Sequence, residues 1–194
     1  MSRKEGDKDG DITLIVCGRI NSRSLDNIGK YLDCKDIKEI IIGGWENDPN
    51  LNMLKPFTNK ERIRIVLKPL PTYVHVHSHL PPTLLYQIKC ILNTVCEVKT
   101  KYVLRTRSEE FYNDIQIFVD KFKENPTGIL CGNVLFKPIY GHMGDHLYML
   151  STKECVNMMT TCDNWLQKGL LLDVEVAITV LIFQFHVLKW QYSS

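Results

Sequence analysis

Short apolar runs alternate along the chain with segments in which apolar residues recur at helical spacing. A continuous β-branched run such as ITLIVCG is typical of a strand buried on both faces, because a strand with one wet face would alternate polar and apolar residues. Apolar residues at every third or fourth position instead indicate a helix with one buried face. We therefore predict strands at 12–18, 37–45, 62–69, 101–107, 128–136 and 146–151, and helices at 24–32, 83–95, 111–125 and over much of the remainder.

This alternation predicts an α/β fold with a mainly parallel central sheet of about six strands flanked by helices. Residues 1–10 are charged and contain glycine, so we expect a flexible arm before a single domain at 11–194. The apolar stretch 176–188 is interrupted by Gln184 and His186 and is short for a membrane span. We expect it to form a core helix, without stable membrane insertion.

Composition narrows the class of protein. Lys and Arg number 24 against 22 for Asp and Glu, which gives a formal net charge of +2. A nucleic-acid-binding surface is normally concentrated and basic, so we expect no nucleic-acid partner. The seven cysteines form no CxxC pair, and the polar N-terminus has no secretory leader. These features predict reduced thiols and a cytoplasmic protein.

Polar residues follow three of the predicted strands at the point where each strand ends. Gly18-Arg19 follows the first strand, Trp45-Glu46 ends the second, and Glu109-Glu110 follows the strand that carries Arg105 and Arg107. Because ligands of parallel α/β sheets bind at the carboxyl ends of the strands, we expect these residues to line one cleft.

The two adjacent carboxylates, Glu109 and Glu110, have two interpretations. They could hold Mg²⁺ or Mn²⁺, which take one or two carboxylates together with substrate phosphates, while Arg105 and Arg107 bind the phosphate in a forked geometry. They could instead begin the following helix, where acidic side chains favour the helix dipole. The pattern by itself favours the second interpretation, because acidic helix starts are common.

Two histidine-containing segments are weaker candidates. HVHSH places His75, His77 and His79 on one side of an extended chain, but it lies among prolines, and a loop is the simpler interpretation. GHMGDH combines two glycines with Asp145 and His146, and it reads equally well as a site or as a turn. Motifs of serine hydrolases, P-loop enzymes, dinucleotide-binding dehydrogenases and zincins do not occur.

The order of the motifs carries more information than any one of them. IVCGRI, IIIGGWEND, TLLYQI, KYVLRTRSEEF, YGHMGDHLYML and DVEVAI follow one another over roughly residues 12–181. This succession resembles the WavE-like glycosyltransferases and the small GT-A enzymes of large DNA viruses of algae. In that family a first strand ends in a glycine-containing donor loop, a second ends near Trp-Glu, and a later strand ends in Arg-Ser-Asp. The resemblance implies a GT-A-like, Rossmann-related fold.

Roles for individual residues follow from the resemblance. Arg107-Ser108-Glu109 occupies the place of Arg-Ser-Asp, which implies a cation ligand at Glu109 with help from Glu110, although this chain has Glu where Asp is usual. The family implies contacts to a nucleotide-sugar donor, and acidic or polar groups near the transferred sugar and the acceptor. The donor positions are Gly18, Arg19, Trp45, Glu46, Gln87, Arg105 and Arg107, and the catalytic positions are Asp145, His146 and Glu175.

The implied activity is transfer of a sugar from a nucleotide-sugar donor, expected to be a UDP-sugar, to the hydroxyl of a glycan acceptor. Mn²⁺ or Mg²⁺ would support the diphosphate leaving group, and a viral protein would act in the host cytoplasm. A nucleotidyltransferase or nucleotide-sugar hydrolase would share the nucleotide and the metal. A non-catalytic nucleotide-sugar-binding module, or a fragment of a larger multidomain transferase, is the remaining alternative.

Overall fold

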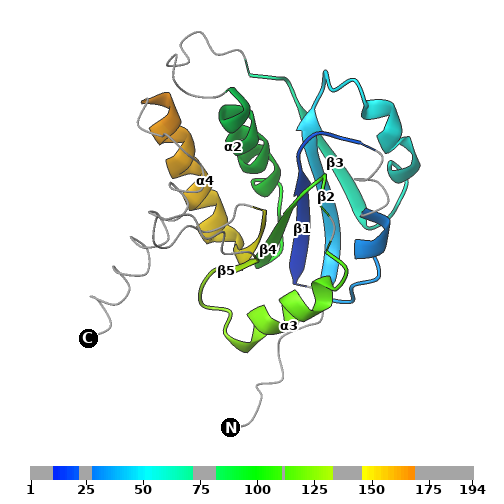
Figure 1. Ribbon diagram of the computed structural model, residues 1–194, viewed down its shortest axis with the longest axis vertical. Helices are drawn as coiled ribbons and strands as arrows, with labels where there is room; N and C mark the ends of the chain where they lie inside the picture. Colours follow the sequence, from blue (N-terminus) through cyan, green and yellow to red (C-terminus); the bar gives the residue numbers. More distant parts are fainter. Residues whose placement is uncertain (1–10, 22–27, 72–81, 111, 133–145, 169–194) are drawn as a thin grey trace.

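A computed structural model describes residues 11–21, 28–71, 82–110, 112–132 and 146–168 of the chain. Its central feature is a six-stranded sheet in the order β3-β2-β1-β4-β6-β5 (Figure 1). The strands are β1 (Ile12–Cys17), β2 (Ile37–Trp45), β3 (Ile63–Lys68), β4 (Tyr102–Arg107), β5 (Leu130–Gly132) and β6 (Leu147–Ser151). The helices are the 3-10 helix η1 (Leu51–Phe57) and the α-helices α2 (Pro82–Val95), α3 (Ile115–Glu124) and α4 (Thr152–Gln167).

The sheet is mixed rather than purely parallel. β3, β2, β1 and β4 run parallel, whereas β6 is antiparallel to both β4 and β5. The prediction of a mainly parallel sheet flanked by helices is confirmed, with β6 as the departure. The rule that helical crossovers give parallel neighbours does not extend to this edge of the sheet, where β6 pairs antiparallel on both of its sides.

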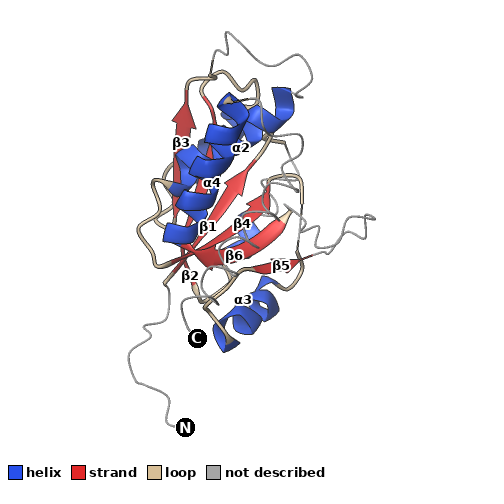
Figure 2. Cartoon of the chain, turned by 90° about the vertical axis from the view of Figure 1, so that its left-hand side faces the viewer, coloured by secondary structure: helices blue, strands red, loops and turns tan. Residues whose placement is uncertain are grey.

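Helices cover both faces of the sheet, and each face has its own apolar cluster. α2 and α4 lie side by side on one face (Figure 2), where they pack on Ile15, Val103 and Leu150. α3 and η1 contribute to the cluster on the other face, which contains Leu14 and Leu104. Because successive side chains of a strand point to opposite faces, a strand buried on both faces is predominantly apolar. The unbroken run of β1, buried at every position, is explained in this way.

The chain reverses its direction of growth across the sheet between β1 and β4. β2 and β3 are added on one side of β1, and β4 is then added on the other. The strand order therefore reverses between β1 and β4, which lie side by side in parallel, and a crevice forms outside the carboxyl ends of the strands at such a point. This crevice is where an open α/β sheet binds its ligand.

Element boundaries differ from prediction at several points. α3 begins at Ile115 with Asp114 as its N-cap, so Glu109 and Glu110 do not form a helix start and that interpretation is wrong. η1 was not predicted, because Pro56 and its short length hide the helical pattern. Residues 28–31 are helical, within the predicted helix at 24–32. The apolar stretch 176–188 lies outside the described residues, and within them no helix is long and apolar enough to cross a membrane.

Candidate functional site

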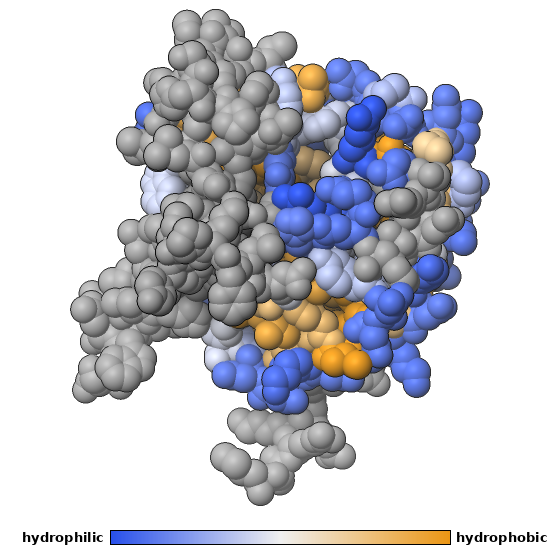
Figure 3. All heavy atoms as spheres, viewed as in Figure 1, coloured by the Kyte–Doolittle hydropathy of each residue, from blue (hydrophilic) through white to orange (hydrophobic). Residues whose placement is uncertain are grey.

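A cavity of about 550 Å³ lies at the carboxyl ends of β1, β2 and β4, where α2 borders the sheet. These ends point toward the top of Figure 1, and Figure 3 shows hydrophilic side chains at this level of the same face, above an apolar area nearer α3. We call this cavity the strand-end pocket. Its lining residues are Cys17, Gly18, Arg19, Asn21, Trp45, Asp48, Tyr86, Gln87, Cys90, Arg105, Arg107 and Glu109.

The ends of β1 and β4 meet closely at Gly18. This glycine has a φ of 149°, a backbone conformation that L side chains rarely adopt. A Cβ at this position would lie 2.5 Å from Ser108 Oγ and 3.0 Å from Glu109 Oε2. Ser108 Oγ donates a hydrogen bond of 2.7 Å to the Arg19 carbonyl, which ties the two loops together. Gly18 therefore permits the contact that brings Glu109 to the pocket.

Two arginines of β4 contribute positive charge to the pocket, in addition to Arg19 from the loop after β1. Arg105 is only 1% exposed, and its Nε and Nη1 have no hydrogen-bond partner among the described residues. Its guanidinium lies 5.6 Å from the centre of the Tyr148 ring, because Tyr148 is its cross-strand neighbour in β6. Arg107 lies on the same face of β4 and approaches Glu109 at 3.7 Å. Burying a guanidinium whose N–H donors have no partner lowers the stability of the folded state, unless an anion binds to it.

Aromatic and amide groups line the part of the pocket between β2 and α2. Trp45 ends β2, and its ring packs edge-on against Tyr86 of α2 with ring centres 6.2 Å apart. Gln87, also from α2, lies beside them in the lining. Aromatic surface of this kind suits a planar, partly apolar group such as a nucleotide base.

Five residues of the lining were not predicted as site residues from the sequence: Cys17, Asn21, Asp48, Tyr86 and Cys90. Asp48 follows Trp45 in the same loop, and Asn21 follows Gly18-Arg19, so the rule that placed their neighbours at strand ends extends to both. Tyr86 and Cys90 come from the face of α2 that packs on the sheet. Helical periodicity predicts that this face of α2 is buried. It does not predict which residues of the face line a cavity.

Glu110 and His146 lie together, outside the lining of the strand-end pocket. His146 Nδ1 contacts Glu110 Oε1, and Tyr112 donates a hydrogen bond of 2.7 Å to Glu110 Oε2. Burial raises the pKa of Tyr112, and the neighbouring Glu110 raises it further. The adjacent carboxylates thus face different surroundings: Glu109 lines the pocket, whereas Glu110 binds Tyr112 and His146.

Other predicted residues lie elsewhere. Glu46 is exposed and does not line the pocket, and its backbone N–H donates to the Lys68 carbonyl at 3.0 Å. Asp145, Glu175 and the three histidines His75, His77 and His79 lie outside the described residues.

The carboxylates of the pocket bear on metal binding. Within the described ranges, no group of three or more His, Cys, Asp or Glu side chains could hold a metal ion. Glu109 and Asp48 are the acidic residues of the lining. Mg²⁺ and similar hard cations accept one or two protein carboxylates when substrate phosphates complete the coordination. The residues of the lining therefore fit a cation that is coordinated partly by the phosphates of a bound ligand. They do not suit a cation that is coordinated by protein side chains alone.

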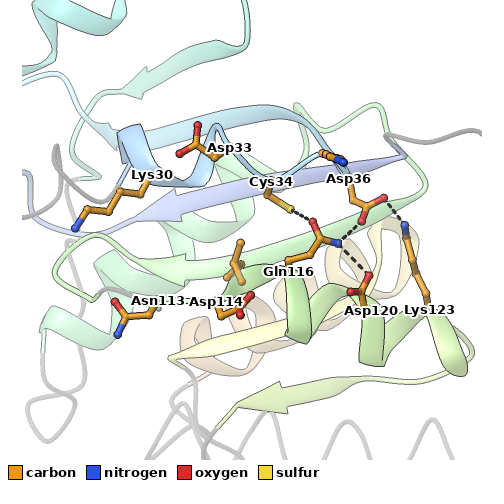
Figure 4. A pocket seen from close by; sticks show the side chains of 11 residues that line it. Lys30, Asp33, Cys34, Asp36, Asn113, Asp114, Gln116, Asp120 and Lys123 are labelled. Carbon is orange, nitrogen blue, oxygen red and sulfur yellow. Dashed lines mark hydrogen bonds and ion pairs between the residues drawn. The ribbon is translucent and has the colours of Figure 1, made fainter.

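A second cavity, of about 670 Å³, lies near the start of β2, between the connection that precedes it and α3 (Figure 4). Its polar groups bind one another. Gln116 donates to Asp120 at 3.0 Å and to Asp36 at 2.5 Å, and Lys123 forms an ion pair with Asp36. Burial works to raise the pKa of Asp36, but the bonds from Lys123 and Gln116 outweigh it and the pKa is lowered. These mutual bonds indicate a structural network that joins α3 to the sheet.

No protein-family profile matches the chain, and no curated protein sequence does so either. Solved structures share its fold. A 4-diphosphocytidyl-2C-methyl-D-erythritol synthase from Anaerococcus prevotii superimposes with a TM-score of 0.53 at 10% identity, over 83% of this chain and 82% of its own. Another synthase of the same name superimposes with a TM-score of 0.54 at 6% identity, and the match covers 89% of this chain and 85% of the synthase.

A mannosyltransferase from Pyrobaculum calidifontis, solved in complex with GDP-Man and Mn²⁺, gives a TM-score of 0.51 at 8% identity. The match covers 78% of this chain and 47% of the mannosyltransferase. At these identities the likeness establishes the fold. It is a GT-A-like α/β fold, found in a glycosyltransferase and in synthases of a diphosphocytidyl compound.

Proposed function

We propose that this protein is a glycosyltransferase that takes its sugar from a nucleotide-sugar donor bound in the strand-end pocket. The observation that carries the proposal is Arg105, a buried guanidinium with unused hydrogen-bond donors on the wall of the pocket. Arg107 adds a second positive charge on the same face, and Glu109 provides a carboxylate beside it. This combination suits a diphosphate, whose charge arginines and a cation can share.

The proposed orientation of the donor follows from the two kinds of side chain in the lining. The Trp45 and Tyr86 rings offer a surface for the base, whereas the arginines of β4 attract the diphosphate. Gly18 has no side chain, so the backbone of the loop after β1 is accessible to a ligand where this loop meets Ser108. We propose a UDP-sugar as the donor, as the family resemblance implies, and the solved mannosyltransferase complex makes GDP-sugars the comparison to test.

Charge stabilisation explains how the pocket would promote transfer. When the bond between the sugar and the diphosphate breaks, negative charge develops on the departing phosphate. Arg105 and Arg107 are already in place to stabilise this charge, and no reorganisation of solvent is needed around the buried Arg105. A bound Mn²⁺ or Mg²⁺ held by Glu109 would supply further stabilisation of the leaving group.

The acceptor would be a glycan hydroxyl, with Asp145 and His146 as the residues proposed to act beside it. The contact with Glu110 holds the ring of His146 through Nδ1. Glu175 remains a proposed acidic group of the same region. Glu110, which the sequence suggested as a second metal ligand, is better explained as a residue that positions His146.

The two adjacent glutamates provide a matched test. Titration calorimetry of UDP- and GDP-sugars with Mn²⁺ should show binding to the unaltered protein. Glu109→Gln removes a carboxylate from the pocket, and we expect affinity in the presence of Mn²⁺ to fall about tenfold or more, as for loss of one charged contact. Glu110→Gln changes the neighbouring carboxylate outside the lining, and it should leave donor affinity within about twofold.

Equal losses in both variants would contradict the assignment of Glu109, and absence of binding by any nucleotide sugar would contradict the donor site. A nucleotidyltransferase is the second candidate, because the solved synthases match a larger share of their own length than the mannosyltransferase does. Product analysis separates the two. A glycosyltransferase releases a nucleoside diphosphate from a nucleotide sugar, whereas a nucleotidyltransferase releases pyrophosphate from a nucleoside triphosphate and a sugar phosphate.

A further inference from the structure

Two thiols line the strand-end pocket, one from the sheet and one from α2. Cys17 is the last residue of β1 and Cys90 belongs to α2, and they are 3% and 6% exposed. Thr94, one turn after Cys90, bonds to the Cys17 thiol and to the backbone of Cys90. The Cys17 thiol donates to Thr94 Oγ1 at 3.5 Å, and Thr94 Oγ1 donates to the Cys90 carbonyl at 2.6 Å. The Cys17 thiol is therefore anchored to α2, the helix that carries Cys90.

Tight packing keeps this arrangement in place. Gly43 lies beside Cys17 in the sheet, and a Cβ at Gly43 would meet Thr94 Oγ1 at 1.9 Å and Cys17 Sγ at 3.2 Å. α2 can approach the sheet this closely because position 43 has no side chain. A side chain there would push Thr94 away from the Cys17 thiol.

The charge around the thiols differs from that around the other cysteines. The hydrogen bond from the Cys90 thiol lowers the pKa of Cys17, with further lowering by Thr94 and by the Arg105 guanidinium, against burial, which raises it. The pKa of Cys90 is raised well above its usual value by the same bond. Elsewhere burial raises the pKa of Cys131, Cys155 and Cys162 to about 12. Of the two thiols, Cys17 is therefore the one that ionises more readily.

We propose that Cys17 is an oxidation site for hydroperoxides on the wall of the strand-end pocket, and that Cys90 converts the oxidised Cys17 into a disulfide. The proposal goes beyond sugar transfer and does not depend on it. It rests on the pairing of two pocket-lining thiols beside a buried arginine whose Nε and Nη1 have no partner among the described residues.

The chemistry needs one hydroperoxide molecule. The Cys17 thiolate attacks the peroxide oxygen, the O–O bond breaks, and Cys17 becomes a sulfenic acid while the peroxide leaves as an alcohol or water after taking up a proton. The Cys90 sulfur then attacks the Cys17 sulfur, an S–S bond forms, and the sulfenic oxygen leaves as water with the thiol proton. Two thiols are oxidised and one peroxide is reduced.

Peptide mass mapping after mild oxidation tests the proposal on the full chain. The reduced protein is treated with about one equivalent of hydrogen peroxide, and the remaining thiols are alkylated before digestion. We expect a cross-linked pair of peptides containing Cys17 and Cys90, with a mass loss of about 2 Da for the two hydrogens removed. Free thiols should fall from seven to about five.

Substitutions define each role. Cys90→Ser should leave Cys17 as a sulfenic acid that a cyclic 1,3-dione traps, whereas Cys17→Ser should leave Cys90 reduced under the same treatment. Cys96→Ser is the matched control, because Cys96 is exposed just after α2, and this variant should form the same cross-link. Oxidation of Cys96 while Cys17 and Cys90 remain alkylated would overturn the proposal. A Cys17 adduct that never links to Cys90 in the unaltered protein would overturn the role of Cys90.

Discussion

At the scale of single residues, Gly18 shows most directly how backbone conformation creates the site. Its φ of 149° and the 2.5 Å separation between a hypothetical Cβ and Ser108 Oγ mean that any side chain would both strain the backbone and displace the loop after β4. Glu109 belongs to that loop, and its Oε2 would lie 3.0 Å from the same Cβ. The geometry of the pocket and the local stability of the fold therefore both depend on the absence of a side chain at Gly18.

Gly18→Ala should destabilise the protein by about 1–3 kcal/mol, the usual cost of a residue forced into an unfavourable backbone conformation. Donor binding should weaken as well, because Ser108 and Glu109 must move. Urea unfolding measures the first effect and calorimetry the second. Gly29→Ala is the matched control: a Cβ there meets no atom within 4 Å in a short helical segment, so stability should hold or rise by up to about 1 kcal/mol. Equal effects of the two substitutions would contradict this account of Gly18.

At the scale of elements, the network around Asp36 connects the start of β2 to α3. Asp36 is buried, and Lys123 and Gln116, both from α3, bind its carboxylate. The pKa of Asp36 is therefore lowered below its ordinary value of 3.8. A lowered pKa in the folded state means that the unfolded state binds more protons, so this contribution to stability is present above about pH 4 and is lost as pH falls below that value.

Lys123→Met should reduce the free energy of unfolding by about 1 kcal/mol near neutral pH, a modest value because about half of the Lys123 side chain is exposed. The difference between the variant and the unaltered protein should shrink as the pH falls below the ordinary value of 3.8 and Asp36 becomes protonated. Urea unfolding at several pH values measures both. Lys121→Met is the control, since Lys121 pairs with Glu124 on the exposed surface of α3. A loss that stays constant with pH would show that the carboxylate is not responsible.

The elements also show how far sequence reasoning reaches. β1, β2 and β4 were predictable because each carries an apolar run that only a doubly covered strand requires, and the residues at their ends followed from the parallel rule. The start of α3 was not, because the aromatic residues at 111 and 112 extend its apolar pattern backward, whereas Asp114 caps the helix later. The opposite roles of Glu109 and Glu110 depend on Gly18 and His146, which are distant in sequence and cannot be read from two adjacent identical letters.

At the scale of the whole molecule, the strand-end pocket joins elements that otherwise belong to separate layers. β1, β2 and β4 form one wall, and α2 supplies Tyr86, Gln87 and Cys90 from the layer above. α3 packs on the opposite face of the sheet and contributes no residue to this lining. A ligand in the pocket would bridge the sheet and α2 without contacting α3.

Amide hydrogen exchange should report this asymmetry. A bound nucleotide sugar stabilises every conformation that keeps the pocket intact, so local openings that move α2 away from the sheet become rarer and its amides exchange more slowly. Openings confined to α3 leave the pocket unchanged, so exchange in α3 should be little affected. Mass spectrometry of the protein with and without the donor and Mn²⁺ would compare peptides from these two helices. Equal slowing in both would indicate a global rather than a local effect, and slowing in α3 without α2 would place the ligand at the cavity lined by Asp36 and Gln116 instead of the strand-end pocket.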